Sequence, residues 1–376
     1  MILLENGPFG EPALFDSPRR LIRADTAAEV DAALSAIDAA RDEGAWLAGY
    51  ASYELGYALE PKLSALMPPR PPGPLLHFGV YDSPRLAQPL LDQAGAEAAG
   101  ATIARANPLW DAAAHARAVR AVQDYIAAGD VYQVNLTMQM VARVTGSPLG
   151  LYGALRNRQA VAHGAFVALP DAPIILSRSP ELFFATDARG RIETRPMKGT
   201  APRATNPAHD AALKLELQES IKNRAENLMI VDLLRNDISR IARVGSVRVP
   251  ALFAIESYAT VHQMVSHVTG DLVARTAASE IFRALFPCGS ITGAPKIRAM
   301  EIIHELEAGP RGIYCGGIGW IAPDGASAFN VAIRTMTLAG DEVSFGVGGG
   351  IVIDSTAEGE WEEALWKARF ADLTPA

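Results

Sequence analysis

The stretch SFGVGGGIVIDSTAEGEWEEALWKA, residues 344–368, decides the fold class. Its first half is a strand-like run interrupted by glycines, and its second half has the three-to-four-residue spacing of an amphipathic helix. Ser355 and Glu358 have the spacing of a capping box, so we expect the helix to begin beside them. Its apolar side consists of Trp361, Ala364, Leu365 and Ala368.

Other strand-like runs, VYQVNL (131–136) and GAFVAL (164–169), alternate irregularly with helical patterns and glycine-rich turns. This order favours a layered α+β domain over a regular βαβ repeat. A doubly wound nucleotide-binding fold is disfavoured, because no GxGxxG follows a strand and GSITGAPK (289–296) lacks the spacing of a P-loop. We expect a loop at MPPRPPGP (67–74), because its prolines cannot continue a helix or a central strand.

We place a domain boundary near residue 108, which divides an N-terminal region, 1–108, from a catalytic domain, 109–376. The region before the boundary carries few motifs, and the segment AGAEAAGATIARANP (94–108) that precedes it is made mostly of small residues.

The composition excludes several classes of protein. With 49% hydrophobic and 20% charged residues, the chain of 376 residues has the balance of a globular protein. Its net charge of −8, with Lys and Arg scattered, disfavours nucleic-acid binding. No apolar run reaches membrane-spanning length and the N-terminus lacks signal-peptide features, so we expect a cytoplasmic protein without membrane contact. The two cysteines, Cys288 and Cys315, suggest neither a disulfide framework nor a zinc site.

The segment 218–242 has the pattern of a long helix with two stripes. Glu219, Asn223 and Glu226 form the polar stripe, which by itself is better explained by solvation than by function. The apolar stripe expected to be buried consists of Ile221, Ala225, Leu228, Val231, Leu234, Ile238 and Ile241.

Acidic residues also follow one face of the C-terminal helix, where Glu360, Glu363 and Lys367 are one turn apart. Two carboxylates without nearby thiols or imidazoles suit a hard cation such as Mg²⁺. A merely solvated face is the alternative.

Two further segments could approach an anionic ligand. Ser290 and Thr292 precede a helix whose first turn contains Pro295, so free backbone N–H groups and Lys296 could bind an anion there, although ordinary helix capping explains the pattern equally well. The glycines of VGGGIV (347–352) allow close contact between backbone and ligand, or simply a tight bend.

Lys198 is the least expected residue, because it lies between a proline and a Gly-Thr pair in ETRPMKGTAPR (193–203). It is either a surface charge or an amine nucleophile. The second role requires its pKa to fall from about 10.4, through burial or through a neighbouring cation such as Arg195 or Arg203.

Seven ordered motifs together resemble the chorismate-utilising enzyme family, which includes anthranilate, isochorismate, salicylate and aminodeoxychorismate synthases. The resemblance covers residue 110 to the end and implies an α+β fold like that of anthranilate synthase component I, a sandwich of large antiparallel sheets flanked by helices. The motifs are SRSPELFF, RPMKGTAPR, NRAENLMIVDLLRND, FPCGSITGAPKIRAMEIIHELE, YCGGIGW, FNVAIRTM and GGGIVIDS with EWEEALWKA.

The resemblance also implies roles for single residues. Glu226, Glu360 and Glu363 are expected to bind Mg²⁺, which neutralises one carboxylate of chorismate, and Glu181 is expected to be the general acid that protonates the departing 4-hydroxyl. Ser290 and Thr292 remain candidates for substrate binding by their position. The groups implied for the other substrate carboxylate are Thr200, Tyr314, Arg334, Gly348, Gly349 and Lys367.

Two positions separate the reactions within the family. Isochorismate and salicylate synthases carry a lysine base where this chain has Gln133, and anthranilate synthases carry a small residue where it has Lys198. The resemblance therefore implies the subgroup of aminodeoxychorismate synthase component I, in which Lys198 attacks C2 and ammonia enters at C4. Anthranilate synthase component I and an inactive chorismate-binding subunit are the alternatives.

The chain has no G-x-C-x-G glutaminase motif, so we expect ammonia to come from a glutamine amidotransferase partner, component II. One departure from the family pattern concerns Gln263, which stands where many relatives have histidine, close to the hydroxyl that leaves.

Overall fold

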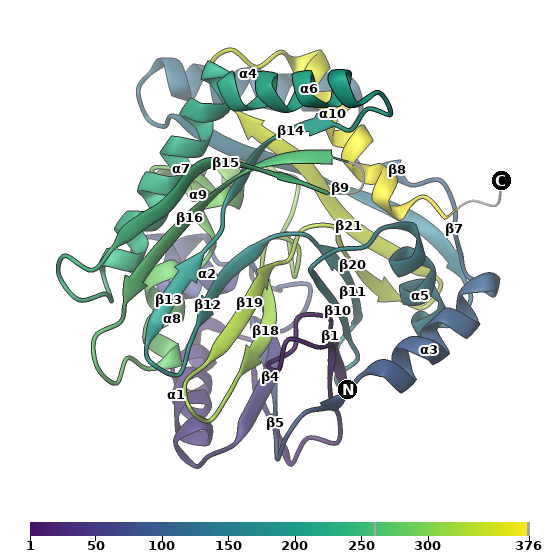
Figure 1. Cartoon of the computed structure of the whole chain (residues 1–376), viewed down its shortest axis with the longest axis vertical. Helices are drawn as coiled ribbons and strands as arrows, with labels where there is room; N and C mark the ends of the chain where they lie inside the picture. Colours follow the sequence, from purple (N-terminus) through teal and green to yellow (C-terminus); the bar gives the residue numbers. More distant parts are fainter. Residues whose placement is uncertain (259–260, 374–376) are drawn as a thin grey trace.

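The computed structural model describes residues 1–258 and 261–373. Two large antiparallel sheets form the centre of the molecule, and helices flank them (Figure 1). The predicted α+β sandwich is therefore confirmed, including the strands expected at 131–136, 164–169 and 344–353.

The first sheet has eleven strands, and its longest pair is β9 with β21, which stay in register from Glu342 opposite Arg143 to Ile351 opposite Val134. In spatial order its strands are β17 (Gly293–Ala294), β9 (Gln133–Thr145), β21 (Glu342–Ile351), β20 (Thr335–Ala339), β11 (Ile174–Ser179), β10 (His163–Val167), β1 (Ile2–Leu4), β2 (Ala13–Phe15) and β6 (Arg85–Leu86), with β7 (Thr102–Ile103) and β8 (Asn107–Pro108) beside β9.

The second sheet has ten strands. In spatial order they are β14 (Met197–Pro202), β16 (Val261–Asp271), β13 (Arg191–Thr194), β12 (Leu182–Thr186), β19 (Ser327–Val331), β18 (Gly317–Ile321), β4 (Trp46–Ala51), β5 (Leu76–Tyr81) and β3 (Arg20–Ala24), with β15 (Arg248–Ser257) beside β16.

Helices cover the outer faces of both sheets. The α-helices are α1 (Ala27–Asp42), α2 (Leu55–Leu59), α3 (Gln88–Glu97), α4 (Ala112–Ala127), α5 (Pro148–Arg158), α6 (Pro207–Glu219), α7 (Ile221–Ser239), α8 (Ala278–Leu285), α9 (Lys296–Leu306) and α10 (Ala357–Ala368). Short 3₁₀ helices are η1 (Pro61–Leu66), η2 (Ala98–Gly100), η3 (Gly289–Ile291) and η4 (Arg369–Ala371).

Apolar side chains form three buried layers that hold these elements together. Ile2 and Phe15 of the first sheet share a cluster with Tyr50 and Trp320 of the second, so the two sheets pack directly against each other. Helices α1, α7 and α8 pack on the second sheet through one cluster, and α5 and α10 pack on the first sheet through another. Burying these apolar surfaces is the main force that stabilises such a layered fold.

The N-terminal region contributes strands to both sheets. Strands β1, β2 and β6 belong to the first sheet, and β3, β4 and β5 to the second. Strand β8 pairs with β9 at the point where we placed the boundary. The division into 1–108 and 109–376 stays a prediction.

The sequence pattern misplaced two details. Only Val231, Leu234 and Ile238 of the stripe in the 218–242 segment are buried. Ile221 is 86% exposed, Leu228 is also exposed, and Ile241 is half-buried. The capping box at Ser355 and Glu358 is wrong, because Thr356 is the N-cap of α10 and its hydroxyl accepts from the backbone N–H of Gly359. Ser355 instead hydrogen-bonds to Glu360.

The expected loop at 67–74 is confirmed, because it separates η1 from β5. Both cysteines are buried and free. Within residues 1–258 and 261–373, every helix is too short or too polar to cross a bilayer.

Candidate active site

Lys198 lies on β14, directly before Gly199, at a point where this strand meets α7. Gly199 has a φ of +91°, and a Cβ there would lie 3.0 Å from the Asn223 side chain. Glycine is therefore required for both the backbone conformation and the close approach. The glycine after the lysine brings the nucleophile candidate next to the polar stripe of α7.

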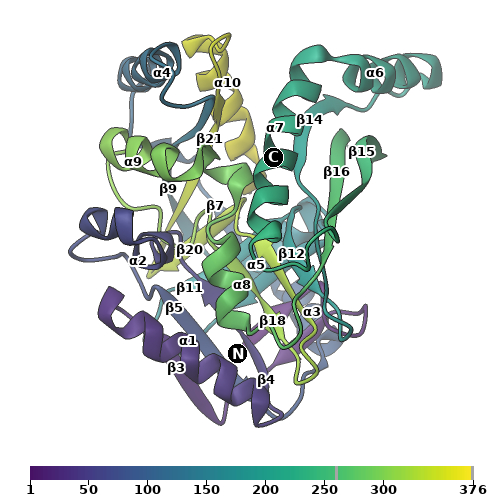
Figure 2. The same cartoon turned by 90° about the vertical axis from the view of Figure 1, so that its left-hand side faces the viewer.

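Four charged residues surround Lys198, and they come from three other parts of the chain. Burial lowers the pKa of Lys198, Glu226 of α7 opposes that shift, and Lys367 of α10 adds to it. Glu181 and Glu363 are the remaining charged neighbours, and both raise the pKa. In Figure 2, α7 is drawn between α10 and β14. The structure thus brings both predicted catalytic residues together with Glu226, Glu363 and Lys367.

Arg195 and Arg203 do not have the role that the sequence suggested for them. Arg195 forms an ion pair with Glu256, and Arg203 forms one with Asp210. Because their charges are compensated by carboxylates, burial and Lys367 are what lower the pKa of Lys198.

Glu181 lies between β11 and β12 and is only 5% exposed. Burial raises its pKa to about 7, although a hydrogen bond from Ser290 and the charge of Lys198 oppose the shift. The Ser290 hydroxyl donates to Oε1 of Glu181 at 2.8 Å. A carboxyl group with such a pKa can donate a proton at neutral pH, as the predicted general acid must.

Helix α10 directs three charged side chains at the glycine-rich part of β21. Nζ of Lys367 lies 2.7 Å from Oε1 of Glu363 and donates to the carbonyl oxygen of Gly348 at 2.8 Å. A Cβ at Gly349 would lie 2.7 Å from Oε2 of Glu360. Burial raises the pKa of Glu360. Burial also acts to raise the pKa of Glu363, but Lys367, Lys198 and Lys222 together lower it.

The predicted metal ligands supply carboxylate oxygens, which suit Mg²⁺, but their side chains do not converge on one point. Glu360 and Glu363 both reach the position above Gly349, and Glu226 faces Lys198. In the part of the chain that the structure describes, no group of three or more acidic, His or Cys side chains is close enough to hold a metal ion. Mg²⁺ is usually held by one or two carboxylates together with substrate oxygens and water, so the residues present fit it.

The other candidates for substrate binding are less clearly grouped. The Thr292 hydroxyl donates to the carbonyl oxygens of Cys288 and Gly289, within its own turn. The Tyr314 ring covers Gly346, where a Cβ would lie 2.1 Å from the ring. Lys296 forms an ion pair with Asp237 at 2.7 Å, so its charge is already compensated by a protein carboxylate.

Arg334 is a half-buried cation at the start of β20. Burial lowers the pKa of its guanidinium. Among residues 1–258 and 261–373, no side chain forms an ion pair with it. A half-buried guanidinium without a protein carboxylate is suited to bind an anionic ligand.

Thr200 is exposed, and its hydroxyl donates to Oε1 of Gln263 at 2.9 Å. Gln263 in turn donates to the carbonyl oxygen of Gly199 at 2.9 Å. Gln263 therefore holds the turn beside Lys198.

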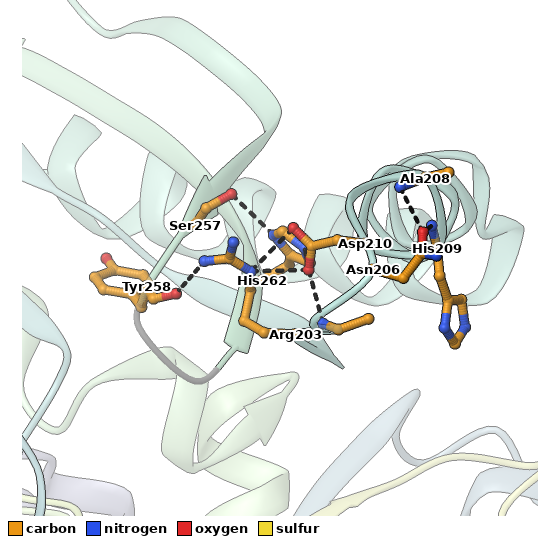
Figure 3. Close-up of polar contacts among 9 residues, drawn as sticks. Arg203, Asn206, Ala208, His209, Asp210, Ser257, Tyr258 and His262 are labelled. Carbon is orange, nitrogen blue, oxygen red and sulfur yellow. Dashed lines mark hydrogen bonds and ion pairs between the residues drawn. The ribbon is translucent and has the colours of Figure 1, made fainter.

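A polar network fixes the chain that follows this turn (Figure 3). Asp210 of α6 accepts hydrogen bonds from Arg203 at 2.9 Å and from the backbone N–H of Ala204 at 2.9 Å. His262 of β16 lies 3.0 Å from the same carboxylate and 2.8 Å from the Ser257 hydroxyl. We call these residues the Asp210 network, and it connects α6, the end of β14 and the β15–β16 hairpin.

Sequence reasoning did not place Gln133 among the site residues, although it used this position to choose the reaction. Its side chain is fully buried, and within the described ranges neither its Oε1 nor its Nε2 has a hydrogen-bond partner. A Cβ at Gly350 would lie 2.8 Å from its amide carbon. The feature of the sequence that could have identified Gln133 as a site residue is its polar side chain inside the otherwise strand-like run VYQVNL.

Comparison with known proteins identifies the family of this chain. Residues 9–372 match the family described as chorismate binding enzyme. A protein of Escherichia coli (strain K12) named aminodeoxychorismate synthase component 1 is 46% identical over 248 residues, which are 66% of this chain and 54% of that protein. An aminodeoxychorismate synthase of Streptomyces griseus is 47% identical over 247 residues, 65% of this chain and 34% of that protein.

The fold comparison gives the same result. Anthranilate synthase component I from Streptococcus pneumoniae TIGR4 superposes with a TM-score of 0.79 and 25% identity, over 95% of this chain and 91% of that one. The matched part of the chain spans about half the length or less of the curated relatives. The match to the family covers nearly all of the sequence, and on this basis the chain belongs to the chorismate binding enzymes.

Proposed function

We propose that this chain is component I of an aminodeoxychorismate synthase, which replaces the 4-hydroxyl of chorismate with an amino group from ammonia. The observation that carries the proposal is the proximity of Lys198 to Glu181. Burial lowers the pKa of the amine and raises that of the acid to about 7. Each shift favours the uncharged form that its proposed role requires.

In the proposed reaction the neutral amine of Lys198 attacks C2 of chorismate while the C4 hydroxyl leaves as water, protonated by Glu181. Ammonia then adds at C4, and the bond between C2 and the lysine breaks, which restores the free amine. The net change is the exchange of a hydroxyl for an amino group. Ser290 holds Glu181 in place through its hydrogen bond.

Chorismate is a dicarboxylate, and two parts of the site are suited to bind its charges. Arg334 is unpaired with any described carboxylate, and Lys367 is held over Gly348 by its bond to the backbone. Glu226, Glu360 and Glu363 would hold Mg²⁺, which supplies positive charge for the second substrate carboxylate. The remaining candidates, Thr200, Thr292, Tyr314 and Gly349, belong to the same proposed pocket.

We further infer that a glutamine amidotransferase subunit supplies the ammonia, and that the enzyme works in the cytoplasm. Several bacterial relatives, among them those of Escherichia coli and Bacillus subtilis, have names that include the word component, which supports a partner of this kind. The two free, buried cysteines agree with a reducing compartment.

Anthranilate synthase component I is the second candidate, because the solved structure of such a protein has the same fold. Lys198 distinguishes the two reactions. In the proposed aminodeoxychorismate synthesis a lysine attacks C2, whereas in anthranilate synthesis ammonia itself attacks C2 and no lysine nucleophile is needed.

The purified chain should be incubated with chorismate, Mg²⁺ and ammonium, and the product identified by chromatography and mass spectrometry. The proposal expects 4-amino-4-deoxychorismate. Anthranilate with pyruvate would identify the second candidate, and unchanged chorismate would indicate an inactive binding subunit.

A further inference from the structure

We propose that a cavity between the two sheets is a second ligand site, for a neutral single-ring aromatic molecule that bears a hydroxyl or amino group. The cavity has a volume of about 240 Å³ and lies beside Tyr314. We call it the Tyr314 cavity. It is large enough for one ring, because an apolar cavity of about 150 Å³ already accommodates benzene.

The floor of the Tyr314 cavity is a continuous patch of the first sheet. Ile175 of β11 pairs with Thr337 of β20, which pairs with Ser344 of β21, and Gly346 of β21 pairs with Gln139 of β9. All five line the cavity. Four neighbouring strands therefore build this surface, and its shape does not depend on a single loop.

The walls come from the N-terminal region and from the segment that precedes β18. Tyr50 and Ser52, at the end of β4, form one wall. The loop 72–74 and residues 311–314 form further parts of the lining. The aromatic rings of Tyr50 and Tyr314 give the lining the character expected for an aromatic ligand. The Phe345 ring packs on Phe370 at the opposite face of β21, so only the backbone of Phe345 contributes.

Ser52 belongs to this wall, and the described part of the protein leaves its hydroxyl without a hydrogen-bond partner. Its side chain is 2% exposed, and its hydroxyl has no hydrogen-bond partner among residues 1–258 and 261–373. A buried hydroxyl without a partner costs free energy, so it favours a ligand with a polar substituent.

The charge of the lining points to a neutral ligand. None of the lining residues is acidic, and Arg311 is the one basic residue among them. Its guanidinium already binds Glu307 at 2.6 Å and donates to the carbonyl oxygens of Ile291 and Asn135. A carboxylate or an ammonium group in the cavity would therefore lack a counterion.

Tyr314 connects the cavity with the proposed active site, and this part of the inference rests on the proposed function. The Tyr314 ring lies over Gly346, two residues before Gly348 on the same face of β21. A ligand packed against this ring changes the position of a group proposed to bind chorismate. We expect it to change the KM for chorismate more than kcat.

The test uses ¹⁹F NMR with three probes of similar size, 4-fluorophenol, 4-fluorobenzoate and 4-fluorobenzylamine. Saturable broadening of the 4-fluorophenol signal is expected, and Ser344→Phe should abolish it by filling the cavity from β21. Ser239→Phe, at the exposed end of α7, is the control and should leave binding intact. No binding of 4-fluorophenol, or equal binding to Ser344→Phe and the parent, would overturn the proposal.

Two further measurements keep the test decisive. If circular dichroism shows that Ser344→Phe is unfolded, Ser52→Ala is used in its place. This variant should bind 4-fluorophenol about five-fold more weakly than the parent, which is the effect of losing one hydrogen bond. Equal affinity of the variant and the parent would contradict the site. Binding of 4-fluorobenzoate that Ser344→Phe abolishes would contradict the neutral class of ligand. Because 4-fluorophenol binding does not require turnover, it distinguishes failure of the second site from failure of the proposed reaction.

Discussion

The Ser290 hydroxyl lies 2.8 Å from Oε1 of Glu181, and both side chains are buried. The hydrogen bond occupies one oxygen of the carboxyl group, so the second oxygen is the one that can carry a proton. Burial raises the pKa of this group to about 7 despite the bond. Around neutral pH a large fraction of Glu181 is therefore protonated and oriented by a fixed neighbour.

Glu181→Gln should lower kcat about 10²-fold to 10⁴-fold, the usual contribution of a general acid. The acid must be protonated, so the rate of the parent should fall as the pH rises through about 7. Lys198 must be neutral to attack chorismate. Protonation of its amine should therefore lower the rate as the pH falls, which produces the acidic limb of the pH profile. The measurement is kcat/KM against pH, and the alkaline limb near 7 should be missing in the variant.

An unchanged pH profile in Glu181→Gln would contradict the role of this residue. Glu193→Gln is the control, because Glu193 pairs with His267 on β16 and has no place in the proposed site.

Glu363→Gln and Glu226→Gln should each raise the Mg²⁺ concentration needed for half-maximal activity by at least about ten-fold, because each removes an anionic ligand. The measurement is initial rate against Mg²⁺ after removal of metal with a chelator. Glu362→Gln is the matched control, since Glu362 lies in the same helix and is exposed. Equal Mg²⁺ dependence in the parent and all three variants would refute the assignment of these ligands.

Ammonium should support turnover by the purified 376-residue chain, whereas glutamine alone should not, because the chain carries no glutaminase motif. Rates are compared at equal concentrations of the two nitrogen sources. Glutamine-driven product formation that survives further purification would contradict this expectation.

Asp210→Asn should loosen the Asp210 network, because the amide cannot accept all the hydrogen bonds from Arg203, Ala204 and His262. We expect a lower melting temperature and faster proteolysis of the chain between β14 and α6, measured by calorimetry and by mass spectrometry of the fragments. Asp354→Asn, at an exposed position before α10, serves as the control. Identical cleavage of parent and Asp210→Asn would show that the network does not hold this segment.

The sequence was sufficient for the type of fold, and it singled out the charged residues that lie near Lys198, whose roles stay predictions. Alternation and helical periodicity predict which residues share one face of an element, and Val231, Leu234 and Ile238 are buried as expected. Periodicity does not reveal which turns of a helix pack against the hydrophobic core and which turns extend beyond it. The first turns of α7 contact β14, whose residues are only partly buried, and Ile221 and Leu228 are consequently exposed.

Other details depend on contacts between distant segments. The register of β14 against β16 shifts between Met197 and Thr200, and this irregularity leaves Thr200 exposed beside Gln263. The ion pair of Lys296 with Asp237 joins residues 59 positions apart. Neither the shift nor the pair could be predicted from local spacing, because both arise from tertiary packing.

The central claim is that Lys198 is the nucleophile that selects amination at C4. Lys198→Ala should lower kcat by orders of magnitude and change chorismate affinity much less, because Arg334 and the α10 residues remain. Lys222→Ala is the control for loss of a nearby positive charge, since Lys222 lies 4.0 Å from Glu226 on α7.

The most direct measurement is peptide mass spectrometry of the parent protein after incubation with chorismate and Mg²⁺ in the absence of ammonia. The account predicts a covalent adduct on the peptide that contains Lys198, which disappears when ammonium is added. Absence of any adduct, together with full aminodeoxychorismate synthesis by Lys198→Ala, would contradict it and show that ammonia attacks chorismate directly.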